Sequence, residues 1–135
     1  MRMFCLSAAD CTAETIWGDF VPLLDRFERA TGEVSADQVR DAAISDAMQV
    51  WGLQDAERVR LVAVTEIAKT PRGLICTVRV ATGSASRAHQ ERLLDEIGRW
   101  ARSLGCRCVR LVGRKGWLRR FPRLKQVGVV MEWAL

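Results

Sequence analysis

The spacing of apolar residues changes along the chain. Up to about residue 48, and again from 86 to 104, apolar side chains recur every three or four positions, whereas between 49 and 81 they tend to alternate with polar ones. The first spacing places side chains on one face of a helix, and the second places them on one face of a strand. The expected elements are a strand at 2–7, helical segments ending near 32 and 48, strands at 49–54, 58–69 and 73–81, a helix at 86–104, a strand at 106–112, a helical turn at 117–121 and a strand at 126–134.

Residues that begin or end helices support the N-terminal part of this pattern. Asp10 or Thr12 can cap the first helical segment, and Gly32 can end it in the left-handed conformation. Pro22 interrupts the hydrogen-bond ladder within it, which predicts a kink or two abutting helices. The run Ser35–Gln38 has the pattern of a capping box and predicts the start of the next helix.

The order of these elements predicts an α/β fold, with a mixed sheet flanked by helices in a single domain spanning 1–135. The strand at 106–112 follows the long helix and is expected at the centre of the sheet, with 126–134 as a final strand. In that final strand, alternate apolar residues share one face. The expected core residues near the central strand are Leu93, Ile97, Leu104, Val109 and Leu111.

Composition narrows the class of protein. A chain of 135 residues forms one domain, and no apolar run approaches the roughly 18 residues that span a bilayer, so we expect no membrane partner and cytosolic synthesis. The five cysteines are an odd number without a framework spacing, which favours free thiols. Cys106 and Cys108 lie far in sequence from His89, the only histidine, so we expect no metal site.

Charge divides the chain into two parts. Residues 1–96 carry 11 Lys/Arg and 15 Asp/Glu, whereas residues 97–135 carry 10 Lys/Arg and one acid, Glu132. The basic C-terminal third predicts an anionic partner, which is nucleic acid, a phosphate-bearing cofactor or an acidic protein surface; the alternative is a solvated basic face. The most concentrated cations flank two glycines and a tryptophan in the run Gly113–Trp117 and the turn that follows. The residues expected to bind the anion are Arg114, Lys115, Arg119 and Arg120.

The order of elements over essentially the whole chain resembles the fold of the GNAT N-acetyltransferases. A sharper local resemblance lies at 99–121, RWARSLGCRCVRLVGRKGWLRRF. Its Trp-Ala-Arg, Gly-Cys and Gly-Arg-x-Gly-Trp elements are similar to those of small GNAT-related proteins from bacteriophages. The resemblance implies a central mixed sheet and a cofactor gap between the strands at 73–81 and 106–112.

In GNAT enzymes, acetyl-CoA occupies that gap, and its pyrophosphate lies on backbone amides at the start of the following helix, where unsatisfied donors and the helix dipole favour an anion. The family marks this loop with Gln/Arg-x-x-Gly-x-Gly/Ala. Alignment on the Trp-Ala-Arg element places Ala85 at the Gln/Arg position and Ala88 and Gln90 at the two glycine positions, and all three depart from the pattern. A different anion cradle could be built by Gly83, Ser84, Ser86 and Arg87. The alternative is that this loop only caps the helix.

The catalytic groups of the family also lack clear counterparts. GNAT enzymes commonly use a strand carboxylate as general base and a tyrosine as general acid, and this chain has no tyrosine. Glu66 is the best candidate base, because a carboxylate among apolar neighbours suits proton transfer near neutral pH. The alternatives are that Glu66 faces solvent or pairs with Arg79 across the hairpin. We expect His89 to be an exposed residue of the first turn of the helix at 86–104 rather than a base.

These observations lead to three functional hypotheses. The first is a bacteriophage-type GNAT-fold protein with a degenerate acetyl-CoA site. It would act with other phage structural proteins as a structural or accessory component of the particle or its assembly, in the host cytoplasm or incorporated in the virion. The second is an acetyl-CoA-dependent N-acetyltransferase with an atypical pyrophosphate loop. The third is a nucleic-acid-binding protein that uses the basic C-terminal third. The first hypothesis is preferred, and with it the expectation that no cofactor binds.

Overall fold

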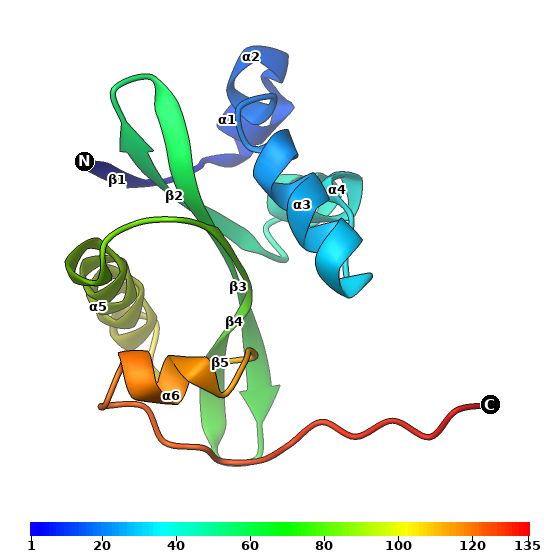
Figure 1. Ribbon diagram of the computed structural model, residues 1–135, viewed down its shortest axis with the longest axis vertical. Coiled ribbons are helices and arrows are strands. Elements are labelled where there is room, and N and C mark those ends of the chain that lie inside the picture. The colour runs from blue at the N-terminus through cyan, green and yellow to red at the C-terminus, as the bar shows by residue number, and fades with distance from the viewer.

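The computed structural model describes all residues from Met1 to Leu135 and contains one five-stranded sheet in the order β1-β2-β3-β4-β5 (Figure 1). The elements are β1 (Arg2–Cys5), α1 (Ala8–Thr12), α2 (Glu14–Trp17), α3 (Val21–Thr31), α4 (Ala36–Ile44), β2 (Gln49–Asp55), β3 (Arg58–Thr70), β4 (Gly73–Gly83), α5 (Arg87–Ser103), β5 (Cys106–Leu111) and α6 (Gly116–Arg120). Strands β1 to β4 are antiparallel neighbours, and β5 runs parallel to β4. The predicted α/β class with a mixed sheet is therefore confirmed.

Alternation along the long strands separates the core into two layers. In β3, Val62 and Val64 are fully buried toward the N-terminal helices, where Phe20, Leu24 and Val39 complete the layer. The intervening Leu61 and Ala63 face the opposite side, which α5 covers with Leu93, Ile97 and Ala101. Figure 1 shows α1 to α4 gathered on one side and α5 with α6 on the other. Both faces of the sheet are covered, which explains why β3 is buried along most of its first half.

The N-terminal helical region follows the predicted breaks but starts differently. Ser7, rather than Asp10 or Thr12, caps α1: its hydroxyl accepts from the Asp10 amide, and the Asp10 carboxylate accepts from the Ser7 amide. Pro22 lies in the first turn of α3, where its missing N–H costs nothing, so the region consists of abutting helices. Gly32 ends α3 at φ +66°, as expected. The capping box at Ser35 is also present.

The C-terminal part requires two corrections. The segment at 126–134 forms no strand and pairs with no neighbour, and as a result β5 lies at the edge of the sheet rather than at its centre. The centre is β3, which pairs with both β2 and β4. Alternating apolar and polar residues indicate that a segment can form a strand. They do not indicate which strand it would pair with.

The core prediction is also corrected at one residue. Leu93 and Ile97 are buried as expected, and Val109 and Leu111 are half-buried. Leu104 is 46% exposed, because it is the C-cap of α5 and has turned off the buried face of the helix. None of the helices is long and apolar enough to cross a membrane.

Candidate cofactor site

Strand β5 ends before β4 does. Their pairing runs from Leu74 opposite Cys106 to Val78 opposite Leu111, and a last hydrogen bond joins the Val112 amide to the Val78 carbonyl at 3.3 Å. Beyond Val78, β4 continues to Gly83 without β5 beside it. The start of α5 follows this unpaired end, so a helix N-terminus lies next to the place where the gap was expected.

Two of the expected cradle residues instead join β4 to β3. Gly83 has φ +109°, and a Cβ there would lie 2.1 Å from the Arg60 carbonyl oxygen, so only glycine fits this approach. The Ser84 amide donates to the same carbonyl at 2.8 Å. Both residues are therefore accounted for by the packing of the strand ends, and the Ser84 amide is no longer free for an anion.

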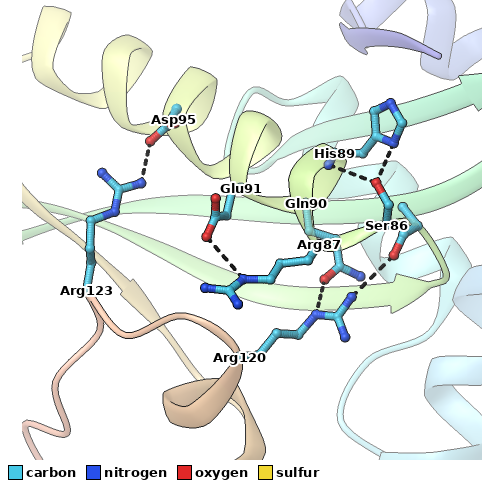
Figure 2. Close-up of polar contacts among 9 residues, drawn as sticks. Ser86, Arg87, His89, Gln90, Glu91, Asp95, Arg120 and Arg123 are labelled. Carbon is cyan, nitrogen blue, oxygen red and sulfur yellow. Dashed lines mark hydrogen bonds and ion pairs between the residues drawn. The ribbon is translucent and has the colours of Figure 1, made fainter.

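The other two cradle residues lie in the first turn of α5 (Figure 2). The Ser86 hydroxyl accepts from the His89 amide at 3.2 Å and lies 2.6 Å from His89 Nδ1, so Ser86 is the cap of α5. The Arg87 guanidinium pairs with Glu91 one turn later, at 3.4 Å. The backbone amides of Arg87 and Ala88 donate to no protein group, as is usual for the first turn of a helix. These two amides are the donors that remain for an anion.

A side chain of α6 contacts this first turn of α5. Arg120 of α6 donates from Nε to the Gln90 side-chain oxygen at 2.6 Å and from Nη2 to the Ala85 carbonyl at 3.4 Å. Figure 2 shows the Arg120 guanidinium beside the start of α5, near Arg87. Arg120 was expected to bind an anion, and the structure places it at the helix N-terminus with two neutral partners. The role of Gln90 was not predicted, since its partner lies 30 residues away and no local pattern marks the pair.

A side chain of α6 borders the space beyond the last β4–β5 pair. Trp117 stacks on Phe121 with ring centroids 5.4 Å apart, and Phe121 is only 4% exposed. Trp117 lies with Val78, Ala81 and Leu111 around a cavity of only about 20 Å³. That volume holds about one water molecule. Phe121 is thus buried and Trp117 half-buried, and a cavity of this size does not fit the pantetheine arm of acetyl-CoA.

The candidate base has a charge partner outside the gap. Glu66 in β3 is half-buried and accepts from Arg79 Nη1 of β4 at 3.1 Å, as the hairpin alternative expected. His89 is half-buried rather than exposed, because its ring and amide both meet the Ser86 hydroxyl. Neither residue is brought together with an acid that could protonate a departing thiolate.

The buried thiol of β4 is also a poor nucleophile. Cys76 is fully buried in β4, and burial raises the pKa of its thiol to about 11, with the neighbouring Cys106 and Cys108 adding to the rise. All five cysteines are free, and no three His, Cys, Asp or Glu side chains lie together as a metal site requires. A protonated thiol is a weak nucleophile and a weak metal ligand.

The remaining basic residues of the loop and α6 face solvent. Arg114, Lys115 and Arg119 are exposed, and none of them pairs with a carboxylate. Arg123 differs, because it pairs with Asp95 of α5 at 2.9 Å (Figure 2). The structure therefore divides the predicted cationic group into Arg120, which contacts protein groups, and three residues that are free to meet a partner.

No protein-family model matches this sequence, and no curated protein matches it. Solved structures match it over nearly their whole length. An acetyltransferase from Trypanosoma brucei superimposes with a TM-score of 0.68 and 18% identity, covering 99% of both chains. A predicted acetyltransferase with acetyl-CoA from Clostridium acetobutylicum gives 0.72 and 10%, covering 98% of this chain and 95% of that one. Ribosomal-protein-alanine N-acetyltransferase from Brucella melitensis biovar Abortus 2308 gives 0.68 and 13%, covering 99% and 94%. The chain therefore has the GNAT acetyltransferase fold.

Proposed function

We propose that this GNAT-fold protein has a degenerate acetyl-CoA site and acts as a structural or accessory component rather than as an acetyltransferase. The observation that carries the proposal is the small space beyond the last β4–β5 pair, where Val78, Leu111 and Trp117 border a cavity of only about 20 Å³. Ligand pockets usually enclose about 300–1,000 Å³. The lack of tyrosine and the ion pair between Glu66 and Arg79 support the same conclusion, since neither a general acid nor a free base faces the gap.

The setting we propose is a bacteriophage particle or its assembly. This part rests on the sequence resemblance of residues 99–121 to small phage GNAT-related proteins. Other phage structural proteins would then be its partners, in the host cytoplasm or in the virion. Co-purification of the chain with assembled particles after density-gradient separation would test this setting, and its absence from all particle fractions would count against it.

Calorimetric titration with acetyl-CoA tests the degenerate site. We expect no saturable heat at micromolar ligand and no thermal stabilisation at millimolar ligand, since ligand that binds only the folded state must raise its stability. The matched variant is Arg87→Ala, which removes an exposed cation at the start of α5 and leaves the gap unchanged. Micromolar affinity in the wild type that falls in Arg87→Ala would overturn the proposal and favour the transferase.

One observation favours that alternative, an acetyl-CoA-dependent N-acetyltransferase. The amides of Arg87 and Ala88 remain unpaired at the N-terminus of a 17-residue helix, with the guanidinium groups of Arg87 and Arg120 nearby. These groups could hold a pyrophosphate if α6 moved out of the gap. Conformational exchange of α6, seen as relaxation dispersion at the Trp117 indole N–H and quenched by acetyl-CoA, would support it.

A second part of the proposal is an anionic partner for the exposed cations. Arg114, Lys115 and Arg119 have no carboxylate partner, which favours a nucleic acid or an acidic protein surface. We expect Arg114→Glu with Arg119→Glu to weaken DNA retention, lowering the log–log salt slope by about 0.9 for each lost phosphate contact. Arg26→Glu with Arg72→Glu makes the same charge change in the N-terminal part. Wild-type protein that fails to bind DNA at low salt would exclude nucleic acid.

A further inference from the structure

The segment Gln126–Leu135, here called the tail, carries an apolar face that packs against nothing in the fold. Four alternate residues form this face, and their exposed fractions are 68% for Val127, 61% for Val129, 83% for Met131 and 91% for Trp133. The tail has no regular structure, and Figure 1 shows it extending away from the sheet. Large apolar side chains in a continuous exposed row usually mark a surface that binds another protein.

The sheet has an open edge that suits such a segment. Strand β5 pairs with β4 on one side and with no strand on the other. In a parallel pair the backbone groups on the outer side of the edge strand lack partners and can receive a further strand. The six residues of β5 span roughly 20 Å, and the ten residues of the tail reach about 33 Å when extended. The tail is therefore long enough to follow this whole edge.

A groove lies beside the same edge. It has a volume of about 200 Å³, and it is bordered by Val109 and Leu111 of β5, the segment Phe121–Leu124, and Glu91, Leu94 and Asp95 of α5. Its walls are mainly apolar. A strand added to β5 would direct alternate side chains to the side that α5 covers, and those side chains would enter this groove.

We propose that the tail of one copy adds as a strand to the open edge of β5 in a second copy, so that two chains exchange tails in a symmetric dimer. The tail's own chain fixes the preceding segment Phe121–Leu124 beside α5, because Arg123 pairs with Asp95 of α5 at 2.9 Å and the Leu124 amide donates to the Phe121 carbonyl at 3.0 Å. From this anchor the tail leads away from its own edge, which makes it available to another molecule. A two-fold exchange uses both tails and both β5 edges, so that neither a free tail nor a free β5 edge remains to add a third copy.

The charges of β5 and the tail, and the surface area that the exchange would bury, agree with the tail of a second copy as the added strand. Arg107 and Arg110 are exposed on β5, and Glu132 in the tail is the only acid among residues 97–135. Two copies of Trp133 would bury roughly 300–500 Å². The other apolar residues of both tails and the surfaces that they cover bring the total toward the approximately 1,200 Å² at which specific interfaces begin. The exchange adds to the structural role proposed above, but it does not depend on the cofactor gap.

Light scattering coupled to size exclusion tests the exchange in the intact chain. We expect the mass of two copies, each 15.2 kDa, at tens of micromolar. Met131→Glu should return the mass to one copy, because its carboxylate would enter a mainly apolar groove that Glu91 and Asp95 already border. Val130→Glu is the matched control: it is one residue away, 85% exposed and on the other face of the tail, so the dimer should persist. Both residues are largely exposed in the single chain, so neither variant compromises folding.

The outcomes separate the exchange from its competitors. A wild-type mass of one copy over the whole concentration range would overturn it, and slow amide exchange of the tail in that monomer would show instead that the tail pairs with its own β5. A dimer that survives Met131→Glu would also overturn it, since the interface would then lie elsewhere. Masses that grow beyond two copies would contradict a closed exchange. None of these results depends on acetyl-CoA titration, so failure here leaves the proposed degenerate site as it stands.

Discussion

Thr65 offers a sharp test of what holds the sheet together next to α5. It is the only polar residue that is fully buried, and it lies in β3 opposite Gln49 of β2. Its hydroxyl accepts from the Trp51 indole at 3.0 Å and donates to the Gln49 side-chain oxygen at 2.9 Å. Trp51 in turn packs edge-on against Trp100 of α5, with centroids 5.4 Å apart. One hydroxyl therefore fixes an aromatic pair that joins the sheet to the helix.

Thr65→Val keeps the shape of the side chain and removes both hydrogen bonds. The Trp51 N–H then stays buried without an acceptor, since Trp51 is only 7% exposed. An unsatisfied buried donor costs about 1–3 kcal/mol. We expect the free energy of unfolding to fall by about 2 kcal/mol. For a chain of this size that corresponds to a fall of roughly 6–10 °C in Tm.

Urea unfolding followed by tryptophan fluorescence measures this loss, and a double-mutant cycle isolates its cause. In a Trp51→Phe background the indole N–H is absent, so Thr65→Val should cost about 1 kcal/mol less than in the wild type. A Thr65→Val variant within about 0.5 kcal/mol of the wild type would refute this account of Thr65. So would equal costs in the two backgrounds.

Two further predictions concern β4. Gly83→Ala should lower the free energy of unfolding by about 2–4 kcal/mol, because its Cβ would lie 2.1 Å from the Arg60 carbonyl oxygen. Gly73→Ala is the control, since Gly73 has a similar φ but no atom within 4 Å of the added Cβ. It should lower the free energy of unfolding by only about 1–2 kcal/mol, and chemical unfolding measures both variants. Burial raises the pKa of Cys76 to about 11 from 9.0, so the folded state keeps its proton where the unfolded state loses it. Stability should therefore fall as the pH rises from 9 toward 11, and Cys76→Ala should make the urea midpoint less sensitive to pH in that window.

The strands of the hairpins were predictable because the signals for each one agree. The ranges 49–54, 58–69 and 73–81 differ from β2, β3 and β4 by at most two residues at either end. Alternation defines their faces, and turn residues at 55–57 and 70–73 end them. Gly32 and the capping box at Ser35 were predictable for the same reason, since each acts on backbone groups within four residues. Contacts of this kind can be predicted because the residues that make them are close together in the sequence.

The position of β5 and the closed gap were not predictable in this way. The edge position of β5 depends on what pairs with it, and the alternating tail does not determine whether its partner is its own chain or another. The Gly83–Arg60 approach, the Arg120–Gln90 bond and the Trp117 contacts join residues from β3, β4, α5 and α6. A glycine and two serines before a helix look the same in sequence whether they cradle a phosphate or let two strands pass closely. Only the carbonyl oxygen of Arg60, 2.1 Å from a Cβ at Gly83, separates the two cases.

The position of α6 also determines how tightly the protein could bind acetyl-CoA, and the two functional proposals predict different affinities. Helix α6 has only five residues and no stability of its own, so its position depends on Trp117, Phe121 and the Arg120 bond to α5. Opening the gap would expose Phe121 and break an aromatic stack, which together cost about 3 kcal/mol. A state that lies 3 kcal/mol above the ground state lowers the apparent affinity of its ligand by roughly 150-fold. A cofactor that would bind the open gap at about 1 μM would then bind the protein at roughly 0.1–0.2 mM. Micromolar binding of acetyl-CoA by the wild type would therefore require a gap that α6 leaves open, whereas a closed gap confines any binding to the upper micromolar range or weaker.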